Sequence, residues 1–556
     1  MTLTHLFSPA SSVFTGGNPA PSRLARAGFA ALFLGCASLV APPLAAQDVT
    51  SQFQISAFKQ AVAEAASVDE SIGAFYRNRD YAPLFTGESD GQRRGALLRA
   101  LASADDHGLP SLRYDPEELR AAFAAAGSTR ERGKVEVMAA QMLVQFSRDL
   151  QSGATEPRRI DSGIVRDIPR RAPEALLADF ASQEPITYFR TLMPRTPEYV
   201  RLMRGKLELE NRIAQGGWGP QVQVKALEPG QQGPAVVALR NRLIAMGYLG
   251  RSATQTYDAA ITRAVQTFQI DHGLSADGVA GPGTIAALNV SPVKRLESVI
   301  VAMERERWLN RPRGARHVLV NIPSFKAQII DNGKVTFETR SVVGKNVPDQ
   351  RTPEFSDTME HMVINPTWNV PRSIATKEYL PLFQRNPNAA GHLKLIDRRG
   401  RVVPRGAVNF RAYNARNFPF AIKQPPSRSN ALGLVKFMFP NKYNIYLHDT
   451  PSKSLFNRDV RAFSHGCIRL ADPFDFAYAL LARQTDDPKG TFQSLLRTGA
   501  ESMVKLDVQI PVHLIYRTAF TQARGHMNYR DDIYGRDARI WNAMAEMGVK
   551  LRGVES

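Results

Sequence analysis

The sequence predicts a multidomain α+β protein in which a helical region, a small helical unit and a mainly-β region follow one another. From residue 53 to 224 apolar residues recur at helical spacing. Residues 227–290 contain two similar helical half-repeats, and from residue 316 short alternating segments indicate strands. The chain has 556 residues, a length that suits roughly two to four domains.

The N-terminus has the features of a secretory signal peptide over residues 1–46. Arg23 and Arg26 precede the apolar run 27–40, and Leu44-Ala45-Ala46 offers a small-residue cleavage site. A lipobox at residues 33–36 is an alternative. No other run reaches the roughly 18 apolar residues of a membrane span. We therefore expect a protein outside the cytoplasm with no membrane span after signal removal. Its net charge of +19 then favours anionic envelope polymers, and not nucleic acid, as partners.

Residues 53–224 are expected to form a helical support. One helix is predicted over residues 135–150, where apolar side chains recur three and four residues apart: Val137, Met138, Met142, Leu143 and Phe146. No cluster of catalytic residue types occurs in this region. A structural role is therefore the simplest interpretation.

Residues 227–290 form a separate unit. In each half-repeat an amphipathic helix ends at a glycine, Gly247 or Gly273, that is followed by an apolar residue. This is the arrangement of a helix C-cap that folds the chain back. A small helical domain is expected.

A helix at 293–308, in a linker spanning 293–312, is expected to lead into the mainly-β domain, residues 316–520. Strands are predicted at 317–322, 326–330, 334–343, 361–364 and 508–516. Asp331-Asn332-Gly333 has the composition of a hairpin turn. Residues 521–556 are expected to be a C-terminal tail.

A long excursion, residues 372–428, interrupts this domain. It holds twelve Lys or Arg residues against two acids, Glu378 and Asp397. Most connections in compact domains have about 4 to 6 residues. We expect a lid over a cleft, attractive to the carboxylates of a ligand, although such a charge run can also be a solvated face.

The reactive centre is predicted around Cys467. The chain has two cysteines, and Cys36 is expected to leave with the signal peptide, so Cys467 has no disulfide partner. Gly466 before it permits a tight turn that would present the sulfur. Asp472 and Pro473 indicate the start of a helix whose apolar face is formed by Phe474, Tyr478 and Leu481.

A thiol of pKa about 8.5 needs a base or a cation nearby to become a nucleophile. In the predicted strand 443–448, alternation places Ile445 and Leu447 on one face and Tyr446 and His448 on the other. His448 can thus line a cleft while its neighbours face the core.

The spacing of His448, fifteen residues, and then Ser464-His465-Gly466-Cys467 resembles the signature of L,D-transpeptidase catalytic domains, which are cysteine enzymes that cross-link peptidoglycan. Gly344 and Thr352-Pro353 also resemble this domain. Residues 75–85 and 148–153 resemble the scaffold domain of the larger periplasmic members. Residues 227–290 resemble a peptidoglycan-binding domain, and the larger members carry a capping subdomain where the excursion lies.

The resemblance implies that Cys467 is the nucleophile, that His448 is its general base, and that the Asp449 backbone carbonyl orients the histidine. His465 and Gly466 would form the oxyanion hole with the Cys467 N–H. We expect four further residues to contact substrate: Trp368, Tyr446, Ser464 and Arg469, the last matching the HGCxR form of the motif. The implied reaction makes 3-3 cross-links through a thioester, releases D-alanine, requires no metal or organic cofactor, and is inhibited by carbapenems. Stem peptides, and other wall-synthesis enzymes, are the implied partners.

Four alternatives stay open. Cys467 could be a small core residue, or His448, His465 and Cys467 could hold zinc. The same cysteine chemistry could serve an L,D-carboxypeptidase or a hydrolase of wall-linked protein. The chain could also be a wall-binding scaffold without activity, and binding of wall by residues 227–290 is itself open, because their pattern defines a fold and not a ligand.

Overall fold

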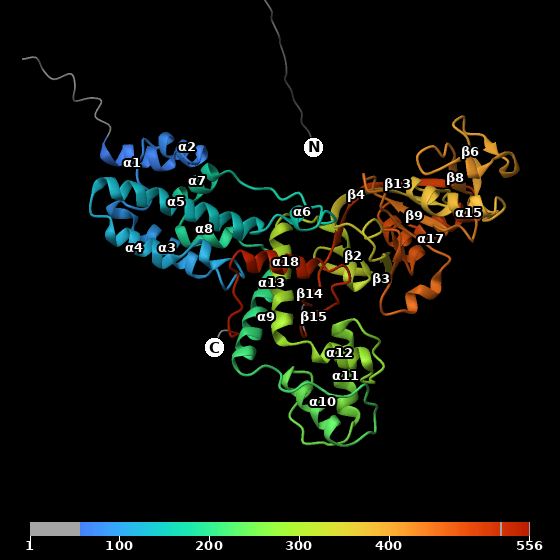
Figure 1. Cartoon of the computed structure of the whole chain (residues 1–556), viewed down its shortest axis with the longest axis horizontal. Helices are drawn as coiled ribbons and strands as arrows, with labels where there is room; N and C mark the ends of the chain where they lie inside the picture. The colour runs from blue at the N-terminus through green and yellow to red at the C-terminus, as the bar shows by residue number, and fades with distance from the viewer. Residues whose placement is uncertain (1–55, 523–524, 555–556) are drawn as a thin grey trace, which may run out of the picture. The chain divides into compact units, whose positions relative to one another are not determined.

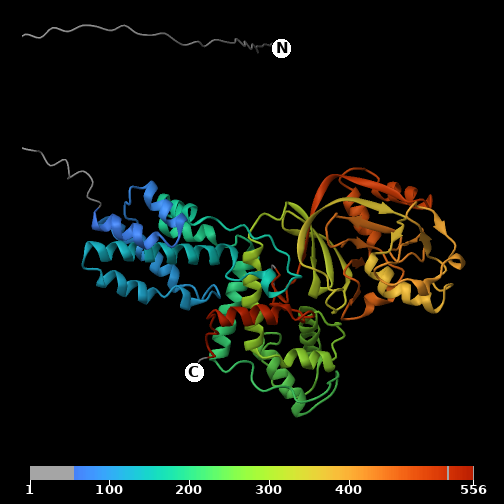
Figure 2. The ribbon, with the colours of Figure 1, turned by 45° about the horizontal axis from the view of Figure 1, so that its top comes forward.

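The computed structural model describes residues 56–522 and 525–554. The predicted signal peptide and Cys36 lie outside the described residues. The described part confirms the expected fold class: a helical N-terminal region, a small helical domain and a mostly-β domain (Figures 1 and 2).

The N-terminal region is built from helices around α5, which contains the predicted helix 135–150 and extends beyond it at both ends. The helices are α1 (Ala57–Ala66), α2 (Glu70–Asn78), α3 (Gly91–Ala102), α4 (Pro116–Ala125), α5 (Thr129–Ser152), α6 (Pro157–Ile160), α7 (Pro173–Ser182), α8 (Pro185–Leu192) and α9 (Pro197–Ala214). A capping box starts α5. The Ser128 hydroxyl accepts a hydrogen bond from the Glu131 N–H, and the Glu131 carboxylate accepts one from the Ser128 N–H.

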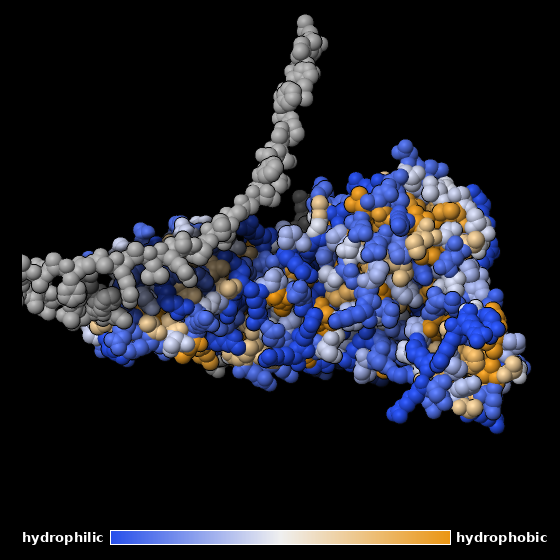
Figure 3. Space-filling view, turned by 90° about the horizontal axis from the view of Figure 1, so that it is seen from above, coloured by the Kyte–Doolittle hydropathy of each residue, from blue (hydrophilic) through white to orange (hydrophobic). Residues whose placement is uncertain are grey.

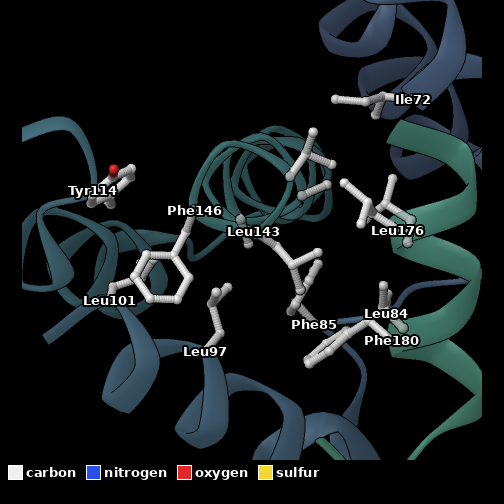
Figure 4. Packing of buried hydrophobic residues seen from close by; sticks show 14 of the residues in the cluster. Ile72, Leu84, Phe85, Leu97, Leu101, Tyr114, Leu143, Phe146, Leu176 and Phe180 are labelled. Carbon is white, nitrogen blue, oxygen red and sulfur yellow. The ribbon is translucent and has the colours of Figure 1, made fainter. Parts of the chain in front are cut away.

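Figure 4 shows the core of this region, where Leu143 and Phe146 of α5 meet Phe85, Leu97 and Phe180 from the surrounding segments. All five side chains are buried. Glu136 is buried in the same helix, and its carboxylate accepts hydrogen bonds from the backbone N–H groups of residues 84–86. The region thus has a closed core of its own.

The second unit contains α10 (Pro234–Ala245), α11 (Ala259–His272) and α12 (Pro282–Asn289). Gly273 caps α11 in the left-handed conformation at φ +70°, and Gly247 follows α10 at φ +85°. A side chain is disfavoured at such angles. The predicted glycine caps are therefore present in both half-repeats.

Helix α13 (Pro292–Trp308) connects the helical parts to the mostly-β domain and packs against α9 and α18 (Arg536–Glu546). Its last turn holds four consecutive charged residues that are all buried. Arg305 pairs with Glu354 at 2.6 Å and with Asp537 at 2.7 Å, and Glu304 accepts a 2.8 Å hydrogen bond from the Thr155 N–H. Removing one member of a buried pair typically costs about 3–5 kcal/mol. These contacts therefore bind residues far apart in the sequence to one helix.

The mostly-β domain is a nine-stranded sheet in the order β11-β3-β12-β10-β9-β4-β13-β1-β2, and β2 also pairs with β3, so the sheet closes on itself. The long β3 makes this closure, because its first part pairs with β2, whereas Ser341 and Val342 pair with β12. The strands are β1 (Arg316–Asn321), β2 (Lys326–Asp331), β3 (Lys334–Gly344), β4 (Phe355–Ile364), β9 (Val435–Met438), β10 (Leu447–His448), β11 (Ala462–Ser464), β12 (Ile468–Leu470) and β13 (Ser502–Ile515).

Helices α16 (Pro473–Leu481) and α17 (Pro488–Arg497) pack against this sheet. The expected apolar residues of α16, Phe474, Tyr478 and Leu481, all pack into the core, but they make up only one of its apolar sides. The buried residues of α16 include Phe476 and Leu480, while Phe474 and Tyr478 turn toward Phe492 of α17. The helix is covered on two sides, so its apolar residues do not form one stripe.

The excursion 372–428 is folded. With β5 (Trp368–Asn369) it forms a second sheet in the order β5-β8-β6-β7, and it encloses its own core around Phe383, Phe410 and Phe418. We call this part the capping subdomain. Its elements are α14 (Arg372–Ile374), a π-helical turn η5 (Ala375–Tyr379), α15 (Leu380–Arg385), β6 (Lys394–Ile396), β7 (Val402–Val403) and β8 (Ala421–Gln424).

The segment expected to be a C-terminal tail is also folded. It contributes β15 (Asn528–Tyr529), which pairs with β14 (Ala519–Phe520), and α18, whose Ile540 and Met544 are buried. Arg536 at the start of α18 is 1% exposed and pairs with Glu354. The C-terminal segment therefore reaches the same buried network as α13.

Among residues 56–522 and 525–554, no helix has the length and apolar content needed to cross a membrane. The face shown in Figure 3 is mostly hydrophilic, with hydrophobic residues in scattered groups.

Candidate active site

Cys467 lies in the tight turn between β11 and β12. Gly466 has φ +114°, a backbone conformation that other residues rarely adopt, and a Cβ there would lie 3.0 Å from Ile445 Cδ1. Both the backbone angle and the limited space therefore favour glycine. The Ser464 hydroxyl donates to the Cys467 carbonyl at 2.6 Å and accepts from the Gly466 N–H at 3.1 Å. Ser464 borders the pocket around the sulfur, yet its hydroxyl is engaged in holding the turn.

Two hydroxyl groups outside the motif support this turn. The Thr352 hydroxyl donates to the Gly466 carbonyl at 2.7 Å and accepts from the Gly344 N–H at 2.9 Å. The Tyr534 hydroxyl donates to the Gly344 carbonyl at 2.6 Å and accepts from the Thr352 N–H at 3.2 Å. Tyr534 comes from the C-terminal segment, and the sequence offered no signal that could have linked it to the site.

His448 ends the short strand β10, which pairs in parallel with β12 so that His448 lies opposite Arg469. The side chain is 4% exposed, and its Nδ1 is 2.5 Å from the Asp449 carbonyl oxygen. With the Nδ1 proton donated to this carbonyl, Nε2 carries the lone pair that can accept a proton. His448 and Cys467 line the same pocket. A base and a thiol that share one pocket are what nucleophilic catalysis by cysteine requires.

The resting state of the pair follows from its burial. Burial first, and then the charge of Arg469, lower the pKa of His448 to about 3. Burial raises the pKa of Cys467 to about 11, although hydrogen bonds from Tyr446 and the charge of Arg469 oppose this rise. At neutral pH both groups are therefore uncharged, a thiol beside a neutral imidazole. The Cys467 sulfur is 3.4 Å from the Asn444 carbonyl oxygen, which can accept the thiol hydrogen.

Arg469 is positioned to stabilise negative charge on the sulfur. It is only partly exposed, and its Nε is buried and has no hydrogen-bond partner among the described residues. Burial lowers the pKa of Arg469, and the Cys467 thiolate would raise it again. The same charge disfavours a proton on His448. Arg469 thus favours a thiolate and disfavours an imidazolium.

Tyr446 and Trp368 form one wall of the pocket. The Tyr446 ring lies 5.6 Å from the His448 ring between centroids. Burial raises the pKa of Tyr446 well above its usual value, and its hydrogen bonds join it to Cys467 and Trp368. The strand predicted at 443–448 is only two residues long, and Ile445, expected on the core face, also lines the pocket. Tyr446 and His448 face the pocket and Leu447 is buried in the core, as predicted.

The capping subdomain closes the other side of the pocket through its π-helical turn. Glu378 Oε1 lies 2.5 Å from Nε2 of His465, and Lys377 Nζ lies 2.5 Å from Asp349 Oδ2. Both contacts join η5 to the rim of the mostly-β domain. The pocket has a volume of about 390 Å³ and is lined by residues of both parts.

The basic cluster of the excursion does not face this pocket. Arg398, Arg399 and Arg401 lie at the turn between β6 and β7, outside the lining residues, and Arg401 pairs with Asp397 at 2.9 Å. Lys377 is the cation that the capping subdomain brings to the pocket rim. The density of basic residues in the sequence therefore did not indicate which cation of the capping subdomain reaches the pocket.

The zinc alternative finds no support in the described part of the chain, where no three His, Cys, Asp or Glu side chains group closely enough to hold a metal ion. His448 and His465 are each engaged elsewhere, the first by the Asp449 carbonyl and the second by Glu378.

Comparisons with known protein families match three parts of the chain. An L,D-transpeptidase catalytic domain matches residues 315–491, a scaffold domain matches residues 70–205, and a putative peptidoglycan-binding domain matches residues 232–288. The described helices and sheet follow the same division. The predicted family resemblance is confirmed for all three parts.

A putative L,D-transpeptidase of Haemophilus influenzae is 34% identical over 244 residues, which cover 43% of this chain and 48% of the relative. The match thus spans about half the length of this curated relative. A solved structure of the L,D-transpeptidase (residues 123–326) of Xylanimonas cellulosilytica is 16% identical, covers 53% of this chain and 98% of that chain, and has a TM-score of 0.17.

Proposed function

Because the chain carries an L,D-transpeptidase catalytic domain, we propose that it is a cysteine L,D-transpeptidase that forms 3-3 cross-links in peptidoglycan. The observation that supports this most is the pairing of β10 with β12. It brings His448 and Cys467 to one pocket beside Arg469, whose buried Nε has no hydrogen-bond partner among the described residues. Conversion of peptidoglycan is the chemistry that the peptidoglycan-binding match also favours.

In the first step the Cys467 sulfur attacks the carbonyl that joins the third stem residue, a diamino acid, to D-alanine. A carbon–sulfur bond forms and His448 Nε2 takes the thiol proton. The amide carbon–nitrogen bond then breaks, and the proton passes to the amine of the leaving D-alanine. A thioester acyl-enzyme remains. The proton transfer must accompany attack, because both groups are neutral at rest.

The turn at Gly466 supplies the oxyanion hole in this proposal. The Cys467 N–H, with the neighbouring backbone of His465, would stabilise the carbonyl oxygen as it gains charge. The Gly466 N–H, which was expected to take part, donates to the Ser464 hydroxyl, so Gly466 contributes through the shape of the turn. Thr352 and Ser464 hold the turn through its carbonyl groups. Such a hole needs a rigid backbone, since removal of one donor typically costs about 10² to 10³ in rate.

In the second step a side-chain amine of a neighbouring stem attacks the thioester. The new amide bond forms, the carbon–sulfur bond breaks, and the amine proton returns through His448 to the sulfur. A thioester that waits for an amine must be shielded from water. We assign this task to the capping subdomain, whose η5 contacts His465 and Asp349 across the pocket.

The site of action follows from the substrate. Peptidoglycan lies outside the cytoplasm, so we propose a periplasmic enzyme that shapes the cell wall, whose stem peptides are its partners together with other wall-synthesis enzymes. Carbapenems carry a strained carbonyl that the same thiol can attack. They are the proposed inhibitors.

The test is chromatography of muropeptides after incubation of the enzyme with purified tetrapeptide muropeptides. We expect 3-3 cross-linked dimers with one D-alanine released per bond, and none from Cys467→Ala. Tripeptides alone would replace this proposal with a carboxypeptidase. Release of a stem-linked model protein without cross-linking would favour the hydrolase, and no product from a folded enzyme would favour a wall-binding scaffold.

A further inference from the structure

A second cleft lies away from the cysteine pocket and shares no residue with it. Its volume is about 750 Å³, against about 390 Å³ for the cysteine pocket. Three parts of the chain form its walls: helix α9, the ends of α10 and α11, and the C-terminal segment around β15. We call it the junction cleft.

One wall of the junction cleft is aromatic. Tyr248, His272 and Tyr529 line it, and the His272 and Tyr529 rings lie 5.6 Å apart at an interplanar angle of 29°. Trp218 also lines the cleft and is only partly buried. Aromatic rings offer flat apolar faces, and Trp and Tyr add a polar group at the edge. Such surfaces suit ligands that have both apolar faces and hydroxyl groups.

His272 leaves an unsatisfied acceptor at this wall. Its side chain is 8% exposed, and its Nδ1 bonds the Phe268 carbonyl at 2.8 Å. Burial lowers the pKa of His272 well below its usual value, so the ring is neutral and Nε2 is an acceptor. That Nε2 has no partner among the described residues. A buried polar atom without a partner costs about 1–3 kcal/mol. A hydroxyl or amide N–H of a ligand would remove this cost.

The facing helix supplies positive charge. Arg201, Arg204, Glu208 and Arg212 line the cleft at helical spacing along α9. Arg201 is held by Glu198 and Thr521. Within the described part of the chain, neither Arg204 nor Arg212 forms an ion pair, although Glu208 lies four residues from each. Two guanidinium groups therefore remain for a carboxylate, which they bind in a fixed fork geometry.

We propose that the junction cleft binds an acidic amino sugar of the wall glycan. Arg204 and Arg212 bind its carboxylate, His272 Nε2 accepts from a hydroxyl or from the N–H of the acetamido group, and the sugar ring lies against Tyr248 and Trp218. The choice of wall glycan rests on the proposed function, but binding does not require Cys467.

The site is composite. Tyr248 and His272 fall within the matched peptidoglycan-binding residues 232–288, whereas Arg204, Arg212 and Trp218 fall outside. Recognition of the acid group would therefore depend on α9. A bound glycan would also contact α9, the helix that packs against α13.

The test uses the full chain with Cys467→Ala, so that the cysteine site cannot react. Binding of the disaccharide N-acetylglucosaminyl-N-acetylmuramic acid is measured by calorimetry and compared with neutral N,N′-diacetylchitobiose. We expect the acidic sugar to bind at least tenfold more tightly. The double variant Arg204→Gln/Arg212→Gln should reduce this difference to less than twofold, while Arg251→Gln/Arg263→Gln, an equal charge change at exposed positions of the small helical unit, should leave it unchanged.

Equal affinity for both sugars, no binding of the acidic sugar, or full binding by the Arg204→Gln/Arg212→Gln protein would each overturn the proposal. Tighter binding of a free stem peptide than of the disaccharide would make the cleft a peptide site. Thioester formation on soluble tetrapeptide by these variants, built on the cysteine-containing chain, verifies folding. The thioester assay also separates the two proposals. If only the glycan proposal fails, thioester formation remains; if only the cysteine proposal fails, sugar binding remains.

Discussion

The resting charge state of Cys467 can be tested by alkylation as a function of pH. Burial raises the pKa of its thiol to about 11, so at pH 7 about one molecule in 10⁴ carries the thiolate. Ionising such a thiol at pH 7 costs about 5 kcal/mol, against about 2 kcal/mol for a free thiol of pKa about 8.5. The thiolate is thus roughly 300-fold scarcer than in a free thiol.

A thiolate of higher pKa is intrinsically more nucleophilic, and this recovers about tenfold. We therefore expect iodoacetamide to alkylate Cys467 about 30-fold more slowly than glutathione at pH 7. The logarithm of the rate should rise with a slope near one from pH 6 to pH 10. The rate is read at the peptide containing Cys467, with the Cys467→Ala protein as a blank.

The Arg469→Gln variant sharpens this prediction. Because the arginine charge lowers the pKa of Cys467, its loss should slow alkylation further at every pH below 10. Lys505→Gln, a neutralised cation on β13 outside the pocket, is the control. A rate that reaches a plateau below pH 8 would show a resting thiolate–imidazolium pair, and the argument from burial would be refuted.

Three further predictions concern the surroundings of the site. Tyr534→Phe should slow thioester formation about tenfold, because it frees the Gly344 carbonyl and leaves the buried Thr352 N–H unpaired at a cost of about 1–3 kcal/mol. Tyr257→Phe, which removes a similar buried hydroxyl in the small helical unit, should not slow it. Equal rates of stopped-flow acylation in the wild type and Tyr534→Phe would contradict the positioning role. Glu378→Gln should shift products from dimers toward tripeptides by weakening the contact with His465, whereas an unchanged ratio on chromatography would remove η5 from water exclusion. The free energy of unfolding should fall as the pH drops from about 6.5 to about 4, because three histidines have a folded-state pKa of about 3 or about 4 and must stay neutral in the folded protein: His107, His448 and His513. Each costs up to about 2 kcal/mol at pH 5. Equal melting temperatures at pH 8 and pH 5 would contradict this.

Cys467 and His448, which line one pocket in the structure, could be picked out from the sequence because their signals are local. A glycine before Cys467 and a strand that alternates through His448 leave signals within a few residues. The helix α13 and the strands β1 to β3 were likewise predicted to within one or two residues, because their apolar periodicity matches their burial.

What the sequence did not predict depends on distant partners. Arg305 has the sequence character of a surface residue, but it is buried because Glu354 and Asp537, 49 and 232 residues away in the sequence, pair with it. Tyr534 supports the turn at Gly466 from a segment that resembled a tail. The excursion was predicted as a lid from its length and charge, yet its own sheet and core, and the part that reaches the pocket, follow from tertiary packing.

The central claim, a nucleophilic Cys467 that forms a thioester, is tested most directly by intact-protein mass spectrometry after incubation with a carbapenem and, separately, with tetrapeptide muropeptide. The account predicts one adduct per molecule in each case, located at Cys467 by peptide mapping and cleaved by hydroxylamine. It predicts no adduct on Cys467→Ala and strongly slowed formation on His448→Ala. An adduct that persists on Cys467→Ala, or an unmodified wild-type protein that still releases D-alanine, would contradict it.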